Sequence, residues 1–318
     1  MSETVVWDDR GVATIDTGYL RSNLAAVYLL AAGNEAAFFD TGVNSALPRY
    51  LETLARSGIA PEAVRYLFLT HIHLDHAGGT GQLLAALPNA QVVVHPRGAR
   101  HLIDPSRLWQ ATCAVYGEAQ AFALYGYLMP VPEERVIPAT EGQRFTVGDH
   151  TIVAFDAPGH ARHHLFYWDE TVRIVFTGDT LGLSYRELDV EGRPTVIPTT
   201  TPSEFDPDAL VATTNRIAAL APEKAYLTHF GGVTEVARLV AEHNRLVDAY
   251  VGIARSARGE GTTRHLEILE GLRALMLEEG ERQGWPLTGE MLLEFLAWDL
   301  ELNAQGLGIW RDRTSRAV

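Results

Sequence analysis

The sequence is poor in cysteine and in long apolar runs. Cys113 is the one cysteine among 318 residues, which excludes an intramolecular disulfide and the disulfide-stapled class of small secreted domains. No 18 apolar residues run together, and the segment from Met1 to Asp9 has neither a basic region nor a long apolar run. We therefore expect no membrane insertion and no export, and a cytoplasmic location.

Basic residues are also few. Lys and Arg number 26 against 40 Asp and Glu, which gives a formal net charge of −14. Proteins that bind nucleic acid draw much of their affinity from Lys and Arg at phosphates, so this charge argues against a nuclease. No phosphate-binding glycine loop, dinucleotide fingerprint or Ser-His-Asp signature occurs. We expect a small-molecule substrate, no nucleic-acid partner and no membrane partner.

Histidine and aspartate, by contrast, are concentrated in one short segment. His71, His73, Asp75 and His76 fall within six residues, directly after the apolar run 64–69. That run predicts a buried strand, at whose end the period of two would point His71 and His73 to the same side. The following loop can bend back and turn Asp75 and His76 toward the same cavity. Four ligand-type side chains at a strand end have no packing rationale, so the segment predicts a metal site.

Three further ligand-type residues, His160, Asp179 and His229, each follow an apolar segment that predicts a strand. Asp40 follows Phe38 and Phe39 in the same way. We expect it to accept the free N–H of a metal-bound imidazole, with a turn-capping role as the alternative. The remaining histidines with apolar flanks are expected to be core or surface residues: His95, His101, His150, His243 and His265.

These motifs resemble the metallo-β-lactamase superfamily in order and approximate spacing, over about residues 12 to 232. The resemblance implies an α+β fold, a four-layer αββα sandwich, here with a carboxy-terminal helical extension. It also implies two divalent ions, for which imidazole and carboxylate ligands favour Zn²⁺, with Fe or Mn as alternatives. In the family pattern one ion is held by His71, His73 and His160, the other by Asp75, His76 and His229, and Asp179 bridges both; Asp75 and Asp179 are also the expected catalytic residues.

Such a pair of ions, roughly 3.5–4 Å apart, can share a hydroxide and polarise a substrate oxygen. The expected function is therefore dinuclear, metal-dependent hydrolysis of a small ester, thioester or lactone. Two alternatives stay open, an iron-dependent oxidoreductase of the persulfide dioxygenase kind and a non-enzymatic sensor or regulatory member of the fold.

The sequence departs from one branch of the family around His160. Glyoxalase II-like members often carry Gly-His-Thr-x-Gly-His, whereas Ala161 and His163 stand here in place of Thr and Gly. This weakens a glutathione-thioester assignment. His160 alone directly follows a glycine, so we expect it to be the ligand. His164 is expected at most to contact a ligand residue, not to bind the metal itself. Bacterial β-lactamases of this fold lack an aspartate at the bridging position, so a penicillin substrate is not expected.

The apolar pattern divides the chain into a catalytic domain, 1–232, and a helical extension packed on it, 233–318. Helices are expected over 45–56, 82–87 and within 97–126, and then from Val233 to about Val251, over 263–279 and over 287–303. The extension should lie near the metal cleft, since its first helix begins close after His229; it could also form the face of a homodimer. The expected strands are 12–15, 24–30, 36–39, 64–69, 151–156, 174–177 and 225–227.

Overall fold

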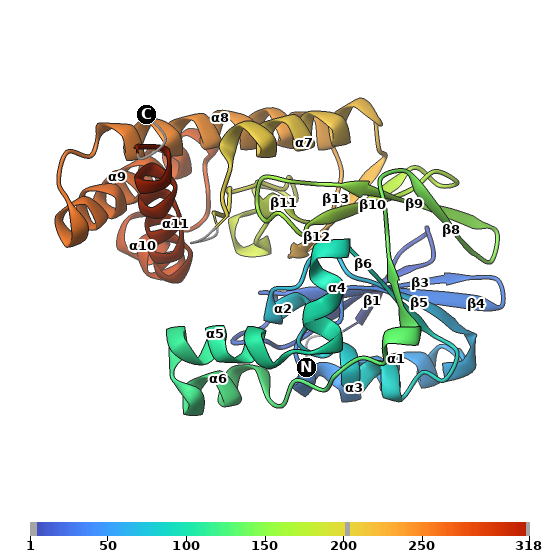
Figure 1. The fold of residues 1–318 in the computed structure, drawn as a ribbon. Helices are drawn as coiled ribbons and strands as arrows, with labels where there is room; N and C mark the ends of the chain where they lie inside the picture. Colours follow the sequence, from blue (N-terminus) through green and yellow to red (C-terminus); the bar gives the residue numbers. More distant parts are fainter. Residues whose placement is uncertain (1–4, 201–203, 316–318) are drawn as a thin grey trace. The chain divides into compact units, whose positions relative to one another are not determined.

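The computed structural model describes residues 5–200 and 204–315, so the first four residues of the amino-terminal segment lie outside the described part. The chain forms two compact units, and each is described by itself (Figure 1). The boundary expected at residue 233 stays a prediction. The sheet unit contains residues 1–156, 163–178 and 222–233; the helical unit contains residues 157–162, 179–221 and 234–318.

The first sheet of the sheet unit has seven strands, in chain order from β1 to β7. The first four pair antiparallel, and β4 to β7 pair in parallel. Because neighbouring parallel strands end at the same edge, the residues after β4 and β5 come together there. The strands are β1 (Val5–Trp7), β2 (Val12–Asp16), β3 (Ala26–Ala32), β4 (Glu35–Phe39), β5 (Val64–Phe68), β6 (Gln91–Val94) and β7 (Val136–Pro138).

The second sheet has six strands in the order β13-β12-β11-β10-β9-β8. Its strand β11 continues from the sheet unit into the helical unit, because the division falls between Gly178 and Asp179. The strands are β8 (Gln143–Val147), β9 (His150–Asp156), β10 (Leu165–Asp169), β11 (Ile174–Leu183), β12 (Lys224–His229) and β13 (Gly231–Val233).

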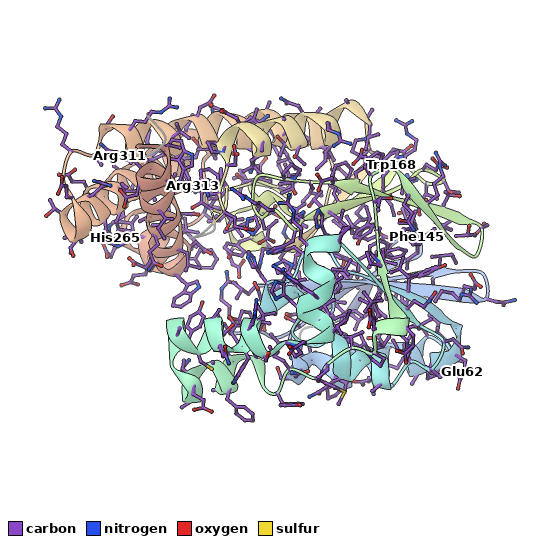
Figure 2. The ribbon with its side chains drawn as sticks, viewed as in Figure 1. Glu62, Phe145, Trp168, His265, Arg311 and Arg313 are labelled. Carbon is purple, nitrogen blue, oxygen red and sulfur yellow. The ribbon has the colours of Figure 1, made fainter. Side chains whose placement is uncertain are left out.

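Aromatic side chains from both sheets fill the core between them. Phe39 of the first sheet stacks on Phe176 of the second, with ring centroids 3.5 Å apart and planes 7° apart. The Phe68 ring meets the Phe145 ring edge to face, with ring centroids 5.5 Å apart (Figure 2 labels Phe145). The Phe68 centroid lies 5.0 Å from that of the tilted Tyr167 ring. These rings are buried, and apolar burial of this kind is the main stabilising contribution to a sandwich.

The other face of the first sheet packs against helices of the same unit. Tyr50 and Leu54 of α1 (Leu47–Arg56), Leu83 of α3 (Thr80–Ala85) and Leu102 of α4 (Pro96–Ile103) belong to this second core. Helix, sheet and sheet therefore form successive layers within the unit. The helical expectation for 97–126 is confirmed by α4, α5 (Ser106–Tyr116) and α6 (Glu118–Tyr125); Cys113 is half-buried in α5.

The helical unit is built from α7 (Pro207–Ala219), α8 (Val236–Ser256), α9 (Gly261–Gln283), α10 (Gly289–Phe295) and α11 (Ala297–Ser315). Helix α7 was not predicted from the sequence. Within the described ranges, no helix has the length and apolarity needed to cross a membrane. Short 3₁₀ helices occupy Asn44–Ala46, Pro61–Ala63, Glu133–Arg135 and Arg186–Leu188.

Two predicted helix bounds in the tail are wrong. Val233 ends strand β13, and α8 begins only at Val236, because Glu235 has a left-handed backbone with φ of 56° that no helix interior adopts. The helix expected over 287–303 is two helices, although amide hydrogen bonds run through the junction at Leu296.

Candidate metal centre

The segment with four ligand-type residues lies just beyond β5, which ends at Phe68. His71 and His73 are therefore not on the strand, as the period-two argument assumed, but in irregular chain after it. Asp75 and His76 lie on the short helix α2 (Leu74–Ala77) rather than on an open loop. The turn forms because the His73 carbonyl accepts the amides of His76 and Ala77, at 3.0 and 2.8 Å.

Glycines after this turn let it approach the chain that follows β4. The amides of Thr41 and Gly42 donate to the His76 carbonyl at 2.8 and 2.9 Å, and Gly79 donates back to Gly42 at 2.8 Å. A Cβ at Gly79 would lie 2.7 Å from the Thr41 carbonyl oxygen. Only glycine allows this contact, which holds α2 against the end of β4.

Asp40, the residue that follows β4, is a buried hydrogen-bond acceptor at the centre of this edge. Its Oδ1 accepts the Thr70 amide at 2.8 Å and the Thr70 hydroxyl at 3.0 Å. Its Oδ2 lies 3.0 Å from His76 Nδ1 and 2.9 Å from the Thr228 hydroxyl. Its backbone is left-handed, with φ of 59°, a conformation that aspartate tolerates better than most residues.

These contacts and one from Leu24 select which nitrogen of three of the imidazoles can face a metal. Ionised Asp40 only accepts, so His76 donates from Nδ1 and keeps Nε2 as a lone pair. The Thr70 hydroxyl donates to Asp40 and lies 3.1 Å from His71 Nδ1. It therefore accepts from that nitrogen, and His71 too keeps Nε2 as a lone pair. His229 Nδ1 donates to the Leu24 carbonyl at 2.7 Å, so its Nε2 is also free of a proton.

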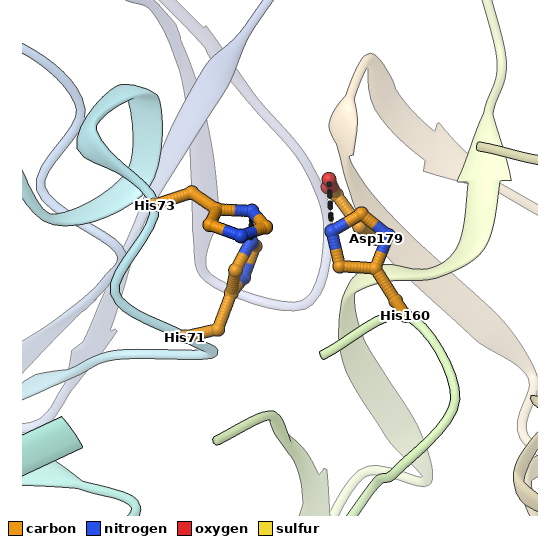
Figure 3. A group of neighbouring side chains, drawn as sticks. All are labelled: His71, His73, His160 and Asp179. Carbon is orange, nitrogen blue, oxygen red and sulfur yellow. Dashed lines mark hydrogen bonds and ion pairs between the residues drawn. The ribbon is translucent and has the colours of Figure 1, made fainter. Parts of the chain in front are cut away.

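Two groups of donor atoms result, each with its atoms within 4.8 Å of one another. The first is His71, His73, His160 and Asp179 (Figure 3). The second is Asp75, His76 and His229. In the second group, Asp75 Oδ2 lies 3.6 Å from His76 Nε2 and 3.4 Å from His229 Nε2. In the first, His71 Nε2 lies 2.8 Å from His73 Nδ1, and His160 Nε2 lies 3.3 Å from Asp179 Oδ2.

Asp179 does not follow its strand, as expected, but lies within β11. The strand continues because all ten of its residues are buried, and Gly178 absorbs the change of direction with φ of 52°. A Cβ at Gly178 would lie 2.7 Å from the Thr70 Oγ1 and from His164 Nε2. His229 is the last residue of β12 rather than the residue after it.

His160 lies between β9 and β10, after a glycine with φ of 132°. A Cβ at Gly159 would lie 2.3 Å from the Leu210 Cα of α7, and the Gly159 carbonyl accepts the Asp206 amide at 2.8 Å. Close packing on α7 therefore explains the glycine. Neither His163 nor His164 belongs to a donor group; the buried His164 ring stacks on His71, with centroids 4.7 Å apart.

The remaining histidines have other surroundings. His95 caps α4, His101 lies half-buried on that helix, and His265 pairs with Glu301. His150 Nδ1 donates to Asp169 Oδ2 at 2.5 Å, and this hydrogen bond raises the pKa of His150. His243 is fully buried in α8, and burial lowers its pKa to about 4.

Sequence reasoning missed the threonines that support the ligands. Thr70 and Thr228 both bond Asp40, and each directly precedes a ligand candidate, His71 and His229. The signal was present in the repeated Thr-His pair at the ends of two strands. Its meaning depended on Asp40, which meets both only in the folded chain.

The donor set fits divalent metal ions of the zinc type. It contains five imidazoles and two carboxylates and no thiolate, as suits a catalytic rather than a closed structural site. Six of the seven donor side chains are at most 23% exposed to solvent, and His71 and His76 are fully buried. Burying so many ionisable groups side by side is costly unless a cation compensates them.

Comparison with known proteins assigns this fold to a known family. The sequence model of the metallo-beta-lactamase superfamily matches residues 21–229, so the chain belongs to that superfamily. Its fold is the α+β metallo-β-lactamase fold with a helical carboxy-terminal region, as the sequence predicted.

Among its relatives, a metallo-beta-lactamase fold-containing protein of Sulfurisphaera tokodaii is 26% identical over 74% of this chain and 83% of its own length. An atrochrysone carboxyl ACP thioesterase of Aspergillus fumigatus is 29% identical over 48% of this chain and 39% of its own. The chain thus matches well under half of the fungal enzyme.

Two solved structures share the fold. An archaeal metallo-beta-lactamase superfamily protein from Sulfolobus tokodaii has a TM-score of 0.65 at 22% identity, covering 94% of this chain and 99% of the other. A family protein from Thermus thermophilus has a TM-score of 0.61 at 21% identity, covering 86% and 94%.

Proposed function

We propose that this protein is a dinuclear metal-dependent hydrolase that cleaves a small ester, thioester or lactone. The observation that carries the proposal is the pair of donor groups, which together use all seven ligand candidates. A thioesterase among the relatives supports carbonyl chemistry of this kind.

In this proposal His71, His73 and His160 hold one ion, Asp75, His76 and His229 hold the other, and Asp179 serves both. When bound, such ions lower the pKa of water toward about 7 and polarise the substrate carbonyl. Zinc is our first expectation, with iron or manganese as alternatives.

The chain's own residues would orient the ligands and transfer the proton. Asp40 accepts a hydrogen bond from His76 Nδ1 and, through Thr70, orients His71, which would keep Nε2 of each ring directed at the metal position. Asp75 is 23% exposed, whereas Asp179 is 6% exposed, so Asp75 is the carboxylate with access to water. We assign Asp75 the role of holding the proton that leaves the attacking water and reaches the departing oxygen or sulfur.

The overall reaction adds water across the carbonyl–oxygen or carbonyl–sulfur bond and releases an acid with an alcohol or thiol. The net charge of −14 gives no attraction for polyanions, so small substrates of low charge are expected.

A substrate panel tests the proposal. The metal-replete protein should hydrolyse at least one of a set of acyl thioesters, esters and lactones, and His71→Ala and Asp179→Ala should lose most of that activity. His265→Ala, at a histidine that belongs to neither donor group, is the matched control. Cleavage of RNA or DNA with no carbonyl substrate hydrolysed, or iron-dependent oxygen consumption with a persulfide, would refute the assignment.

A further inference from the structure

A cavity of about 780 Å³ lies within the helical unit, and all of its lining residues belong to that unit. Its walls are the beginning of α7, the second half of α8 and the end of α11, completed by Arg162 from the loop that carries His160. The volume is within the range of roughly 300–1,000 Å³ that is usual for small-molecule sites. No residue of the two donor groups lines this cavity, so it is separate from the candidate metal centre.

Hydrogen bonds to the backbone hold these walls together. Arg311 of α11 donates to the Ala254 carbonyl of α8 at 2.8 Å, and Arg313 donates to the Phe205 carbonyl before α7 (Figure 2 labels both arginines). Asp206 caps α7 by accepting the amide three residues further on, at 3.2 Å. These three charged residues of the lining therefore serve the structure of the cavity.

Four other charged residues line the cavity with their charges uncompensated. Within the part of the chain that the structure describes, none of them forms an ion pair or a side-chain hydrogen bond: Arg162, Arg255, Asp208 and Asp248. All four are exposed, so their charged ends are accessible to a ligand. An anion alone would meet two carboxylates here, and a cation alone would meet two guanidinium groups. A ligand that carries both charges fits this lining better than either.

The lining between these charges is apolar. Trp310 is 7% exposed and Val251 is 8% exposed, and the Arg255 guanidinium lies over the Trp310 ring, 5.8 Å from its centroid. Asp248, Val251 and Arg255 are spaced three and four residues apart, so they share one face of α8. The helical rise separates Asp248 from Arg255 by about 10 Å along the axis. The α8 wall therefore places an apolar side chain between a carboxylate and a guanidinium group.

We propose that this cavity binds a small zwitterion whose ammonium and carboxylate groups are separated by an apolar segment, as in a dipeptide with apolar side chains. Arg162 and Arg255 bind the carboxylate, since guanidinium groups match its geometry. Asp208 and Asp248 accept from the ammonium group, and Trp310 contacts the apolar segment. The inference goes beyond the proposed hydrolase function and does not depend on it.

Calorimetry on the full-length, metal-replete protein tests the site with four probes. They are the dipeptide Leu-Leu, its N-acetyl derivative, its carboxy-terminal amide and free leucine. Wild type should bind Leu-Leu about ten-fold more tightly than each of the other three, because hydrogen bonds between charged groups are the stronger ones. Each blocked dipeptide lacks one charge, and the two charges of leucine are too close together to reach both ends of the cavity.

Two double variants separate the two ends. Arg162→Gln with Arg255→Gln should lose the preference for Leu-Leu over its amide and keep the preference over the N-acetyl derivative. Asp208→Asn with Asp248→Asn should show the reverse. The preference that each variant keeps shows that its cavity is still folded.

Arg273→Gln and Glu290→Gln are the matched controls. These two side chains lie 3.9 Å apart in the helical unit and do not line the cavity, so both variants should keep both preferences.

Equal affinity of wild type for Leu-Leu and its blocked derivatives, or no measurable binding of Leu-Leu, would overturn the zwitterion site. Tighter binding of either blocked dipeptide would do so too, since it would indicate a site for one charge only. If both preferences survive in both double variants, the dipeptide binds elsewhere, for example at the metal ions, and the assignment to this cavity is wrong. No outcome involves hydrolysis, so failure of the proposed function leaves the test intact.

Discussion

Asp40 links four groups at the edge where β4 and β5 end. It accepts the amide and the hydroxyl of Thr70, Nδ1 of His76 and the hydroxyl of Thr228. Each bond orients a ligand residue or its neighbour. In the proposed metal site Asp40 would therefore support the ligands without belonging to either donor group.

Replacing Asp40 with Asn should weaken metal binding about 10- to 100-fold, the usual effect of losing such a partner. The amide has one acceptor oxygen for bonds that two carboxylate oxygens now take. Zinc affinity, measured by competition with a chromogenic chelator, checks this. Asp156→Asn is the control, since that carboxylate pairs with His95. An unchanged affinity would show that Asp40 only caps a turn.

His243 predicts a specific dependence of stability on pH. Burial lowers its pKa from 6.5 to about 4 in the folded chain. As pH falls from 6.5 to 4, the unfolded chain takes up a proton on this residue that the folded chain does not, so stability is lost over that window. One pKa unit corresponds to about 1.4 kcal/mol, which makes the loss about 3 kcal/mol.

His243→Leu should remove that part of the pH dependence. Urea unfolding at several values between pH 7 and pH 4.5 should give a shallower decline for the variant than for wild type. His265→Leu, at a half-buried histidine of α9, is the comparison. Parallel curves for wild type and His243→Leu would contradict a depressed pKa.

At the scale of elements, the stacked aromatic rings between the sheets position the edge that carries the ligands. Phe176 lies on β11 three residues before Asp179, and Phe39 lies on β4 directly before Asp40. Their close stacking joins the two strands, and both rings are at most 1% exposed.

Phe176→Ala should lower the free energy of unfolding by about 3–5 kcal/mol, through lost burial and the cavity left behind. Phe122→Ala, at a side chain 59% exposed, should change it by no more than about 0.5 kcal/mol. Chemical denaturation of both variants measures the difference. Similar small losses in both would mean that the sheets are not held together at this stack.

How much of this could be read from the sequence differs between residues and elements. His71, His73, Asp75 and His76 were visible because four ligand-type residues fall within six positions. The bounds of β11 and α8 were not, because Gly178 and Glu235 adopt left-handed conformations that local pattern does not reveal. Asp179 was thus predicted by type and order, and its place within a strand was not.

At the scale of the whole molecule, α11 is tied to the segment that follows Asp179 in the helical unit. Asn303 Oδ1 accepts the Thr200 amide at 2.7 Å, and the Tyr185 hydroxyl lies 3.1 Å from Asp299 Oδ1. These bonds connect the tail to the chain leaving β11.

Truncation after about Glu260 removes α9, α10 and α11 and these bonds with them. The apolar face of α8, including the buried Leu246, Val247 and Tyr250, would then lose part of its cover. We expect an aggregating or inactive protein by light scattering and by assay on the substrate that the full chain hydrolyses. A soluble, monomeric and fully active truncated chain would show the tail to be an independent appendage.

The fold was predictable because ligand motifs of one family recur in order along the chain. The hydrogen bond between Tyr19 and Tyr125 was not predictable, since it joins a loop to a helix about a hundred residues further on. The expected domain boundary, homodimer and cytoplasmic location stay predictions.

Metal content of the full chain tests the central claim most directly. Elemental analysis of metal-replete wild type, after removal of loosely bound ions, should give two ions per chain, and His71→Ala and Asp179→Ala should each give fewer. His160→Ala should also lose metal, whereas His163→Ala should keep it. One ion or none in the replete protein, or full content in the His160 variant with loss in the His163 variant, would contradict the two-ion site built from these seven side chains.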